Sequence, residues 1–79
     1  MTGIVARLIA DKGFGFIQAG ATDFFFHRDD FQDDWNTLVY DYNANEKVRV
    51  EFEAGKGPKG PRASRVIRLD KDETTLGDA

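Results

Sequence analysis

Lys12-Gly13-Phe14-Gly15-Phe16-Ile17 places two aromatic residues two positions apart, each directly after a glycine. Successive side chains of an extended strand point to opposite faces of its sheet. Phe14 and Phe16 therefore share one face of a predicted strand, and Gly15 and Ile17 share the other. Buried phenylalanine is common, but other residues of the chain supply a core, so we expect these two rings to be exposed.

A second aromatic stretch, Asp23-Phe24-Phe25-Phe26-His27-Arg28, follows after a short turn. In a strand, Phe25 and His27 share one face, while Phe24 and Phe26 share the opposite one. If the two strands pair, one side of the sheet carries the flat rings of Phe14, Phe16, Phe25 and His27. Unstacked bases of single-stranded nucleic acid bind to platforms of this kind. The opposite face predicts a core that contains Ile17, Phe24, Phe26, Val48, Val50 and Phe52.

Residues 12–17 and 23–31 resemble the two nucleic-acid-binding motifs of the bacterial cold-shock proteins and the wider cold-shock domain family. Residues 59–66 are similar to the run that precedes the last strand in that family. The three motifs stand in the family's order and spacing, and the resemblance covers residues 1–69. It implies an all-β fold, a five-stranded antiparallel OB-type β-barrel that binds single-stranded DNA and RNA.

Two positions depart from the family pattern. Bacterial members usually carry Lys-Trp-Phe-Asn where this chain reads Ala6-Arg7-Leu8-Ile9, so Arg7 replaces a stacking tryptophan. Arg28 stands where a third platform aromatic normally follows the histidine. A guanidinium can stack on a base and also bind phosphate. Two interpretations stay open: the arginines join the platform, or they are solvated surface and binding is weaker.

Alternation and turn residues divide the chain into short strands at close intervals. We expect strands over residues 3–10, 14–18, 24–27, 47–53 and 63–69, the first with a bulge that corrects its imperfect alternation. We expect a short helical turn near residues 29–31 and a Gly/Pro-rich loop over residues 54–62. An RNA-recognition motif is an alternative fold of similar length, but it requires two amphipathic helices. No sustained 3.6-residue period indicates such helices here, so the barrel is favoured. Residues 70–79 are polar and predict a disordered tail.

The composition indicates one small domain. The chain has 79 residues, no cysteine and a single histidine, which excludes disulfides, cysteine-ligated metals and multi-histidine sites. No apolar run approaches the ~20 residues of a membrane span, and the first residues lack the apolar region of a signal peptide. No catalytic constellation is present. We therefore expect a soluble cytoplasmic domain that is not an enzyme and binds no cofactor or metal.

The net charge of −3 hides a segregated distribution. The segment between Glu53 and Asp70 contains five cations and no acid, whereas acids gather in residues 29–34 and in the tail. This segregation allows a basic binding surface on an acidic molecule. The cations that we expect to meet phosphates are Arg7, Lys12, Arg28, Lys59 and Arg62.

Trp35 and His27 each allow two interpretations. Trp35 either caps the platform or closes the core, and we favour the platform. His27 is either a ring at the platform edge or a structural residue bonded to a neighbour, and we favour the edge position.

The function that these patterns favour is single-strand binding, and we expect a monomer. The family resemblance and the weak self-stacking of pyrimidines imply a preference for pyrimidine-rich DNA or RNA. By resemblance, the cellular role is that of an RNA chaperone or a regulator of transcription or translation. The alternative is a protein-interaction module, because Arg7, Arg28 and the acidic residues 29–34 could turn the platform toward a protein partner.

Overall fold

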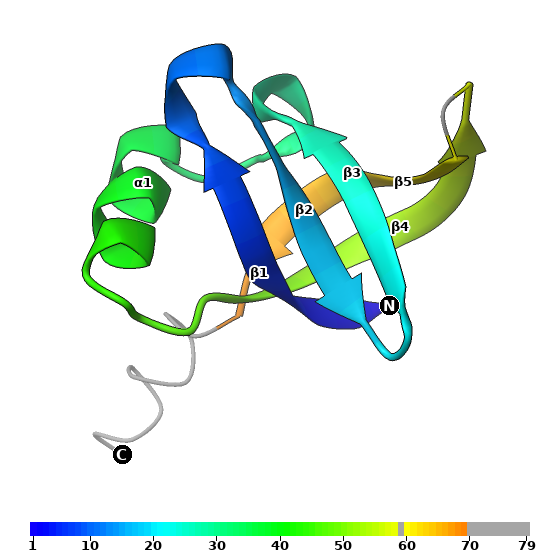
Figure 1. Ribbon diagram of the computed structural model, residues 1–79, viewed down its shortest axis with the longest axis horizontal. Coiled ribbons are helices and arrows are strands. Elements are labelled where there is room, and N and C mark those ends of the chain that lie inside the picture. Colours follow the sequence, from blue (N-terminus) through cyan, green and yellow to red (C-terminus); the bar gives the residue numbers. More distant parts are fainter. Residues whose placement is uncertain (59, 70–79) are drawn as a thin grey trace.

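The computed structural model (Figure 1) describes residues 1–58 and 60–69. The predicted tail and Lys59 lie outside these residues. Five strands close into a barrel in the order β1-β2-β3-β5-β4, which confirms the OB-type fold. The strands are β1 (Thr2–Ile9), β2 (Phe14–Ala19), β3 (Thr22–His27), β4 (Arg49–Gly57) and β5 (Gly60–Arg68).

The expectation that every strand pair is antiparallel is wrong. β3 and β5 pair in parallel where Phe25 meets Arg62, and the other neighbouring strands are antiparallel. The reason is geometric: strand directions cannot alternate all the way around a closed ring with an odd number of strands. One parallel pair is required, and here it joins the aromatic strand β3 to the basic strand β5.

Gly15 explains why the β1–β2–β3 layer can pack so closely. A Cβ atom on this residue would lie 2.6 Å from the Arg7 carbonyl oxygen and 3.0 Å from the ring of Phe26. Glycine is therefore required at this inward position, and its two phenylalanine neighbours point outward. The predicted bulge in β1 is present as a shift of register between Val5 and Arg7.

The core lies where the alternation of the strands predicts it. The six expected core residues are at most 7% exposed: Ile17, Phe24, Phe26, Val48, Val50 and Phe52. They pack with other buried residues into one cluster: Val5, Phe31, Leu38, Ala63 and Val66.

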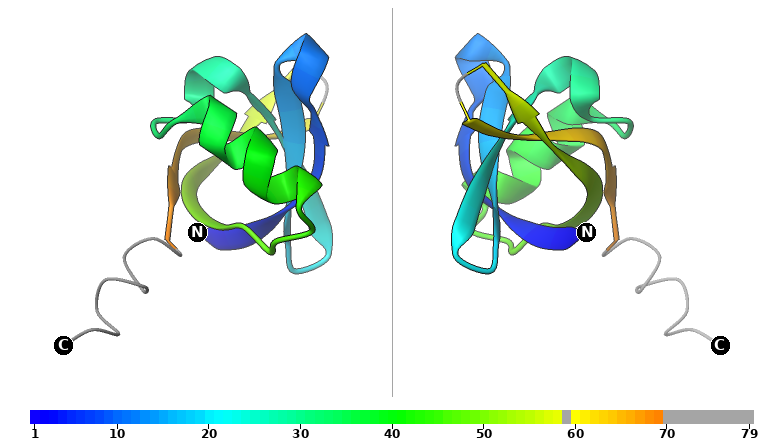
Figure 2. Two further views of the ribbon diagram at one scale, coloured as in Figure 1. Left: turned by 90° about the vertical axis from the view of Figure 1, so that its left-hand side faces the viewer. Right: turned by 90° about the vertical axis from the view of Figure 1, so that its right-hand side faces the viewer.

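A helix that the sequence analysis did not predict, α1 (Trp35–Asn43), lies across one end of the barrel (Figure 2). Asp34 begins it, because its carboxylate accepts hydrogen bonds from the Asn36 N–H at 3.1 Å and the Thr37 hydroxyl at 2.7 Å. Leu38 is the fully buried residue of this helix and packs into the core.

Within residues 1–58 and 60–69, the helices are too short or too polar to span a membrane.

Arg68 ties this helix to the last strand. Its side chain is almost fully buried, and its Nη1 lies 2.8 Å from Asp41 Oδ2 on α1. Its backbone N–H donates to Asp33 Oδ2 at 2.8 Å. Removing one partner of such a buried pair leaves an uncompensated charge. The cation is therefore structural, although the sequence placed it in the basic segment of the chain.

The expected loop over residues 54–62 is mostly strand, and this expectation is wrong. β4 continues to Gly57 and β5 begins at Gly60, so that the two strands form a long hairpin with Gly57 opposite Gly60. Its tip lies at the opposite side of the molecule from α1 (Figure 1). The predicted helical turn is present as the short 3-10 helix η2 (Arg28–Asp30).

Candidate nucleic-acid interface

The register of the barrel arranges the outward residues of the aromatic strands in two rows. Phe16 pairs with Arg7 on β1 and with Phe25 on β3, and Phe25 pairs with Arg62 on β5. In the neighbouring row, Phe14 pairs with Ile9 and His27. Directly paired residues project from the same face of a sheet. The four rings predicted to share a face therefore do share it.

Three of these rings form a compact group that we call the aromatic face: Phe14, Phe16 and Phe25. The centroids of Phe14 and Phe25 are 5.4 Å apart, with 33° between the ring planes. Phe16 meets both of them nearly edge-on, at 6.1 and 5.8 Å. Aromatic pairs prefer such tilted and edge-to-face contacts. All three rings remain partly exposed, so their orientations are fixed while part of their surface is accessible to a ligand.

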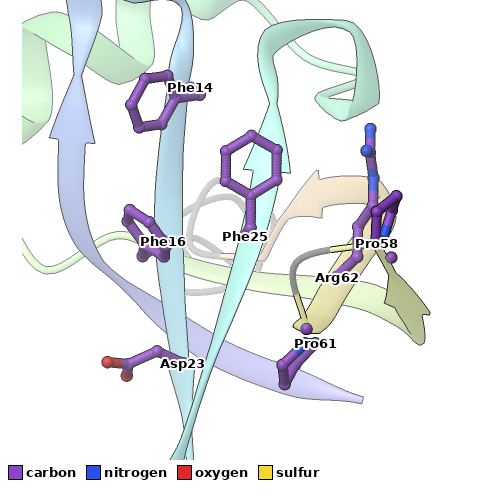
Figure 3. A pocket seen from close by; sticks show the side chains of 9 residues that line it. Phe14, Phe16, Asp23, Phe25, Pro58, Pro61 and Arg62 are labelled. Atoms are coloured by element: carbon purple, nitrogen blue, oxygen red, sulfur yellow. The ribbon is translucent and has the colours of Figure 1, made fainter.

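A cavity of about 570 Å³ lies against the aromatic face. Figure 3 shows Phe14 and Phe16 on β2 beside Phe25 on β3, with side chains of the β4–β5 hairpin across from them. The hairpin contributes Gly57, Pro58, Gly60, Pro61 and Arg62, and β3 contributes Asp23. A mostly apolar cavity with a few polar groups is typical of a ligand site.

His27 is oriented by the turn that follows it. Its Nδ1 accepts a hydrogen bond from the Asp29 backbone N–H at 3.1 Å, and the backbone N–H of His27 donates to Asp30 Oδ2 at 2.9 Å. The two interpretations of His27 are therefore compatible: the turn holds the ring, and the ring stands beside Phe14 at the edge of the aromatic face.

The predicted phosphate contacts fall into two groups. Arg7, Lys12 and Arg28 are exposed and form no ion pair within residues 1–58 and 60–69. Arg62 differs, because its Nη2 lies 2.9 Å from Asp30 Oδ2. Its guanidinium carbon also lies 5.6 Å from the centroid of the Phe25 ring. Lys59 lies outside the described residues.

Comparison with known proteins identifies the family to which this chain belongs. The family model of the 'Cold-shock' DNA-binding domain matches residues 1–69, most of the chain. The chain belongs to the cold-shock domain family.

Bacterial members of that family are similar along nearly their whole length. The cold shock-like proteins CspG of Escherichia coli (strain K12) and CspJ of Salmonella typhi are each 42% identical over 72 residues. Each match covers 87% of this chain and 94% of the relative. Cold-shock domains bind nucleic acid. The three rings of the aromatic face come from residues 12–17 and 23–31, two of the motifs by which the sequence resembles the family.

Trp35 does not join the aromatic face of this cold-shock domain. Its ring lies 6.2 Å from Phe26 and 6.2 Å from Phe31, and it packs against the core. The expectation that it caps the platform is therefore not supported. The cause is local: α1 begins at Trp35 and directs this first residue toward the barrel interior.

Sequence reasoning did not identify several residues that line the cavity. They are Asp23 on β3 and Pro58 and Pro61 of the hairpin. The prolines were interpreted as loop residues, and no local pattern indicates that β5 pairs with β3. Within the described part of the chain, no group of three metal-ligating side chains is present.

Proposed function

We propose that this cold-shock domain binds single-stranded DNA or RNA by stacking bases on Phe14, Phe16 and Phe25, with His27 at the edge. The observation that carries this proposal is the aromatic face itself. The core is complete without these three rings, and they remain partly exposed beside a cavity. Base stacking on such rings is worth about 1–3 kcal/mol per base. Several stacked bases together give a useful affinity without hydrogen bonds that read the base sequence.

The exposed cations supply the phosphate contacts in this proposal. Arg7 shares a row with Phe16, and the backbone N–H of Arg28 donates to the Gly13 carbonyl at 2.8 Å, beside the start of β2. Lys12 directly precedes Gly13 in the chain. Three cations around the rings favour a strand whose bases stack inward while its phosphates follow the rim.

Binding of this kind supports a role as an RNA chaperone or as a regulator of transcription or translation. A protein that traps the open strand shifts the equilibrium of a weak hairpin toward the open form. Opening the hairpin in this way requires no ATP, because the free energy of binding to the open strand drives it. We place this activity in the cytoplasm and assign it to a monomer, because one copy of the domain carries the whole aromatic face.

The first test compares a single strand with its own duplex. A pyrimidine-rich strand, such as oligo(dT) or oligo(U), should bind well, because its bases stack weakly on one another. The same strand in a duplex should not bind measurably, because paired bases cannot reach the rings. Fluorescence anisotropy of an end-labelled oligonucleotide measures both affinities. Equal affinity for the duplex would refute the stacking mechanism, and no binding at all would favour a protein partner.

The second test concerns Arg28, which occupies the position of a family aromatic. Its Cβ lies near Gly13, at 3.7 Å from where a Cβ on that residue would stand. Arg28→Phe should add a ring beside the aromatic face and strengthen binding. It should also flatten the slope of log affinity against log salt by about 0.7, the value for one phosphate contact on a single strand.

Arg28→Ala is the matched control, because it removes the same charge without adding a ring. It should flatten the salt slope equally but weaken binding. If the phenylalanine and alanine variants bind equally, the added ring does not contact the strand.

A further inference from the structure

Arg62 lies in the wall of the cavity, yet its charge is already engaged. Its Nη2 donates to Asp30 Oδ2 at 2.9 Å, and its guanidinium flanks the ring of Phe25 at 5.6 Å. A cation within about 6 Å of an aromatic centroid is attracted by the ring. The two contacts hold the guanidinium between the Asp30 carboxylate and the Phe25 ring. Arg62 is therefore held against the aromatic face before any strand arrives.

Asp30 is well placed to hold Arg62 in this position. Its side chain is only 17% exposed. The Oδ2 atom that contacts Arg62 also accepts a hydrogen bond from the backbone N–H of His27 at 2.9 Å. The 3-10 helix η2 fixes it through a reciprocal cap with His27. The carboxylate thus connects the end of β3 to the start of β5, on the side of the cavity where Arg62 stands.

We propose that Asp30 is a positioning residue for nucleic-acid binding. It neutralises Arg62 and holds its guanidinium beside Phe25, so that Arg62 acts as a flat wall of a base-binding pocket and not as a phosphate contact. This inference rests on the proposed single-strand binding. It assigns phosphate recognition to Arg7, Lys12 and Arg28 and base contact to the Arg62 side of the cavity. The ion pair therefore lowers the salt dependence of the site.

The test compares Asp30→Asn with Asp29→Asn, which removes the same charge from the same turn. The Asp29 side chain is 89% exposed and lies beside His27, not Arg62. Affinity for labelled oligo(dT) is measured at several salt concentrations. Asp30→Asn frees the Arg62 charge, so its slope should become steeper by about 0.7. At high salt it should bind about two- to fivefold more weakly than the wild type, because the guanidinium is no longer held beside the ring. Asp29→Asn should keep the wild-type slope.

Arg62→Met gives an independent measurement, because it keeps an unbranched apolar side chain at this position and removes the charged guanidinium. If Arg62 is a neutralised wall, this variant weakens binding and leaves the slope unchanged. If Arg62 binds a phosphate, the slope flattens by about 0.7. In the double variant Asp30→Asn/Arg62→Met, the slope should return to the wild-type value.

Several outcomes would overturn the inference. A wild-type slope in Asp30→Asn would do so, as would a flattened slope in Arg62→Met or stronger binding by Asp30→Asn at high salt. The asparagine oxygen can still accept the His27 N–H, and thermal melting checks that the variant folds. If it does not fold, Arg62→Met alone decides. Failure of the wild type to bind oligo(dT) would refute the proposed function, whereas these variant results would refute only the role of Asp30.

Discussion

Phe16→Ala and Phe14→Ala are each expected to weaken single-strand binding by about 1–3 kcal/mol, or roughly 5- to 150-fold in Kd. Phe16 stands in the middle of its row, between Arg7 and Phe25, and both rings line the cavity. Each substitution removes a stacking surface without opening the core, because both rings are partly exposed. Stability should fall by much less than the ~3–5 kcal/mol that an emptied core phenylalanine site costs.

Gln18→Ala is the matched control for these variants. Gln18 is exposed, follows Phe14 and Phe16 on the same side of β2, and does not line the cavity. Its affinity should equal that of the wild type. Oligonucleotide titration and thermal melting are carried out on all three variants. Unchanged affinity in both phenylalanine variants would mean that the strand does not use the aromatic face.

The local part of this site could be predicted because it depends on alternation alone. Once the two aromatic stretches are strands, the period of two places Phe14, Phe16 and Phe25 outward and Phe24 and Phe26 inward. Each step uses residues that are neighbours in the chain. The same alternation places the inward side of Gly15, between the two β2 rings, toward the core. In the structure, a Cβ atom on Gly15 would lie against Phe26.

The remainder of the site depends on contacts between distant segments. Asp30 meets Arg62 only because β3 pairs in parallel with β5, and no pattern within either segment encodes that pairing. Pro58 and Pro61 also misled the prediction, since proline usually ends a strand. In the hairpin, Pro58 lies between the two strands and Pro61 pairs opposite Lys56 near the tip.

Helix α1 has only a weak signal in the sequence. Trp35, Leu38 and Tyr42 recur at i, i+3 and i+7, which is the spacing of one helical face. The pattern occupies only nine residues, too few for a sustained period, and charged and polar residues surround it. Trp35 packs against the core. Its ring adjoins that of Phe26, so its fluorescence reports on folding.

Phe26→Ala should have the opposite effect to the substitutions on the aromatic face. Phe26 is fully buried, and its ring lies 6.4 Å from Phe31 and 6.2 Å from Trp35. Emptying such a site costs about 3–5 kcal/mol. A domain of this size has a total stability of only about 4–12 kcal/mol. The melting temperature should therefore fall by at least about 12 °C, or the chain should not fold at all.

Thermal and urea unfolding, followed by Trp35 fluorescence, measure this loss. Phe26→Leu is the graded variant, because it keeps most of the volume and should remain folded well enough to titrate with an oligonucleotide. Its affinity should stay close to that of the wild type, since Phe26 points away from the cavity. The two faces then separate cleanly: one set of phenylalanines changes binding, and the other changes stability. If Phe14→Ala melts the protein while Phe26→Leu only weakens binding, the faces are inverted and the stacking mechanism fails with them.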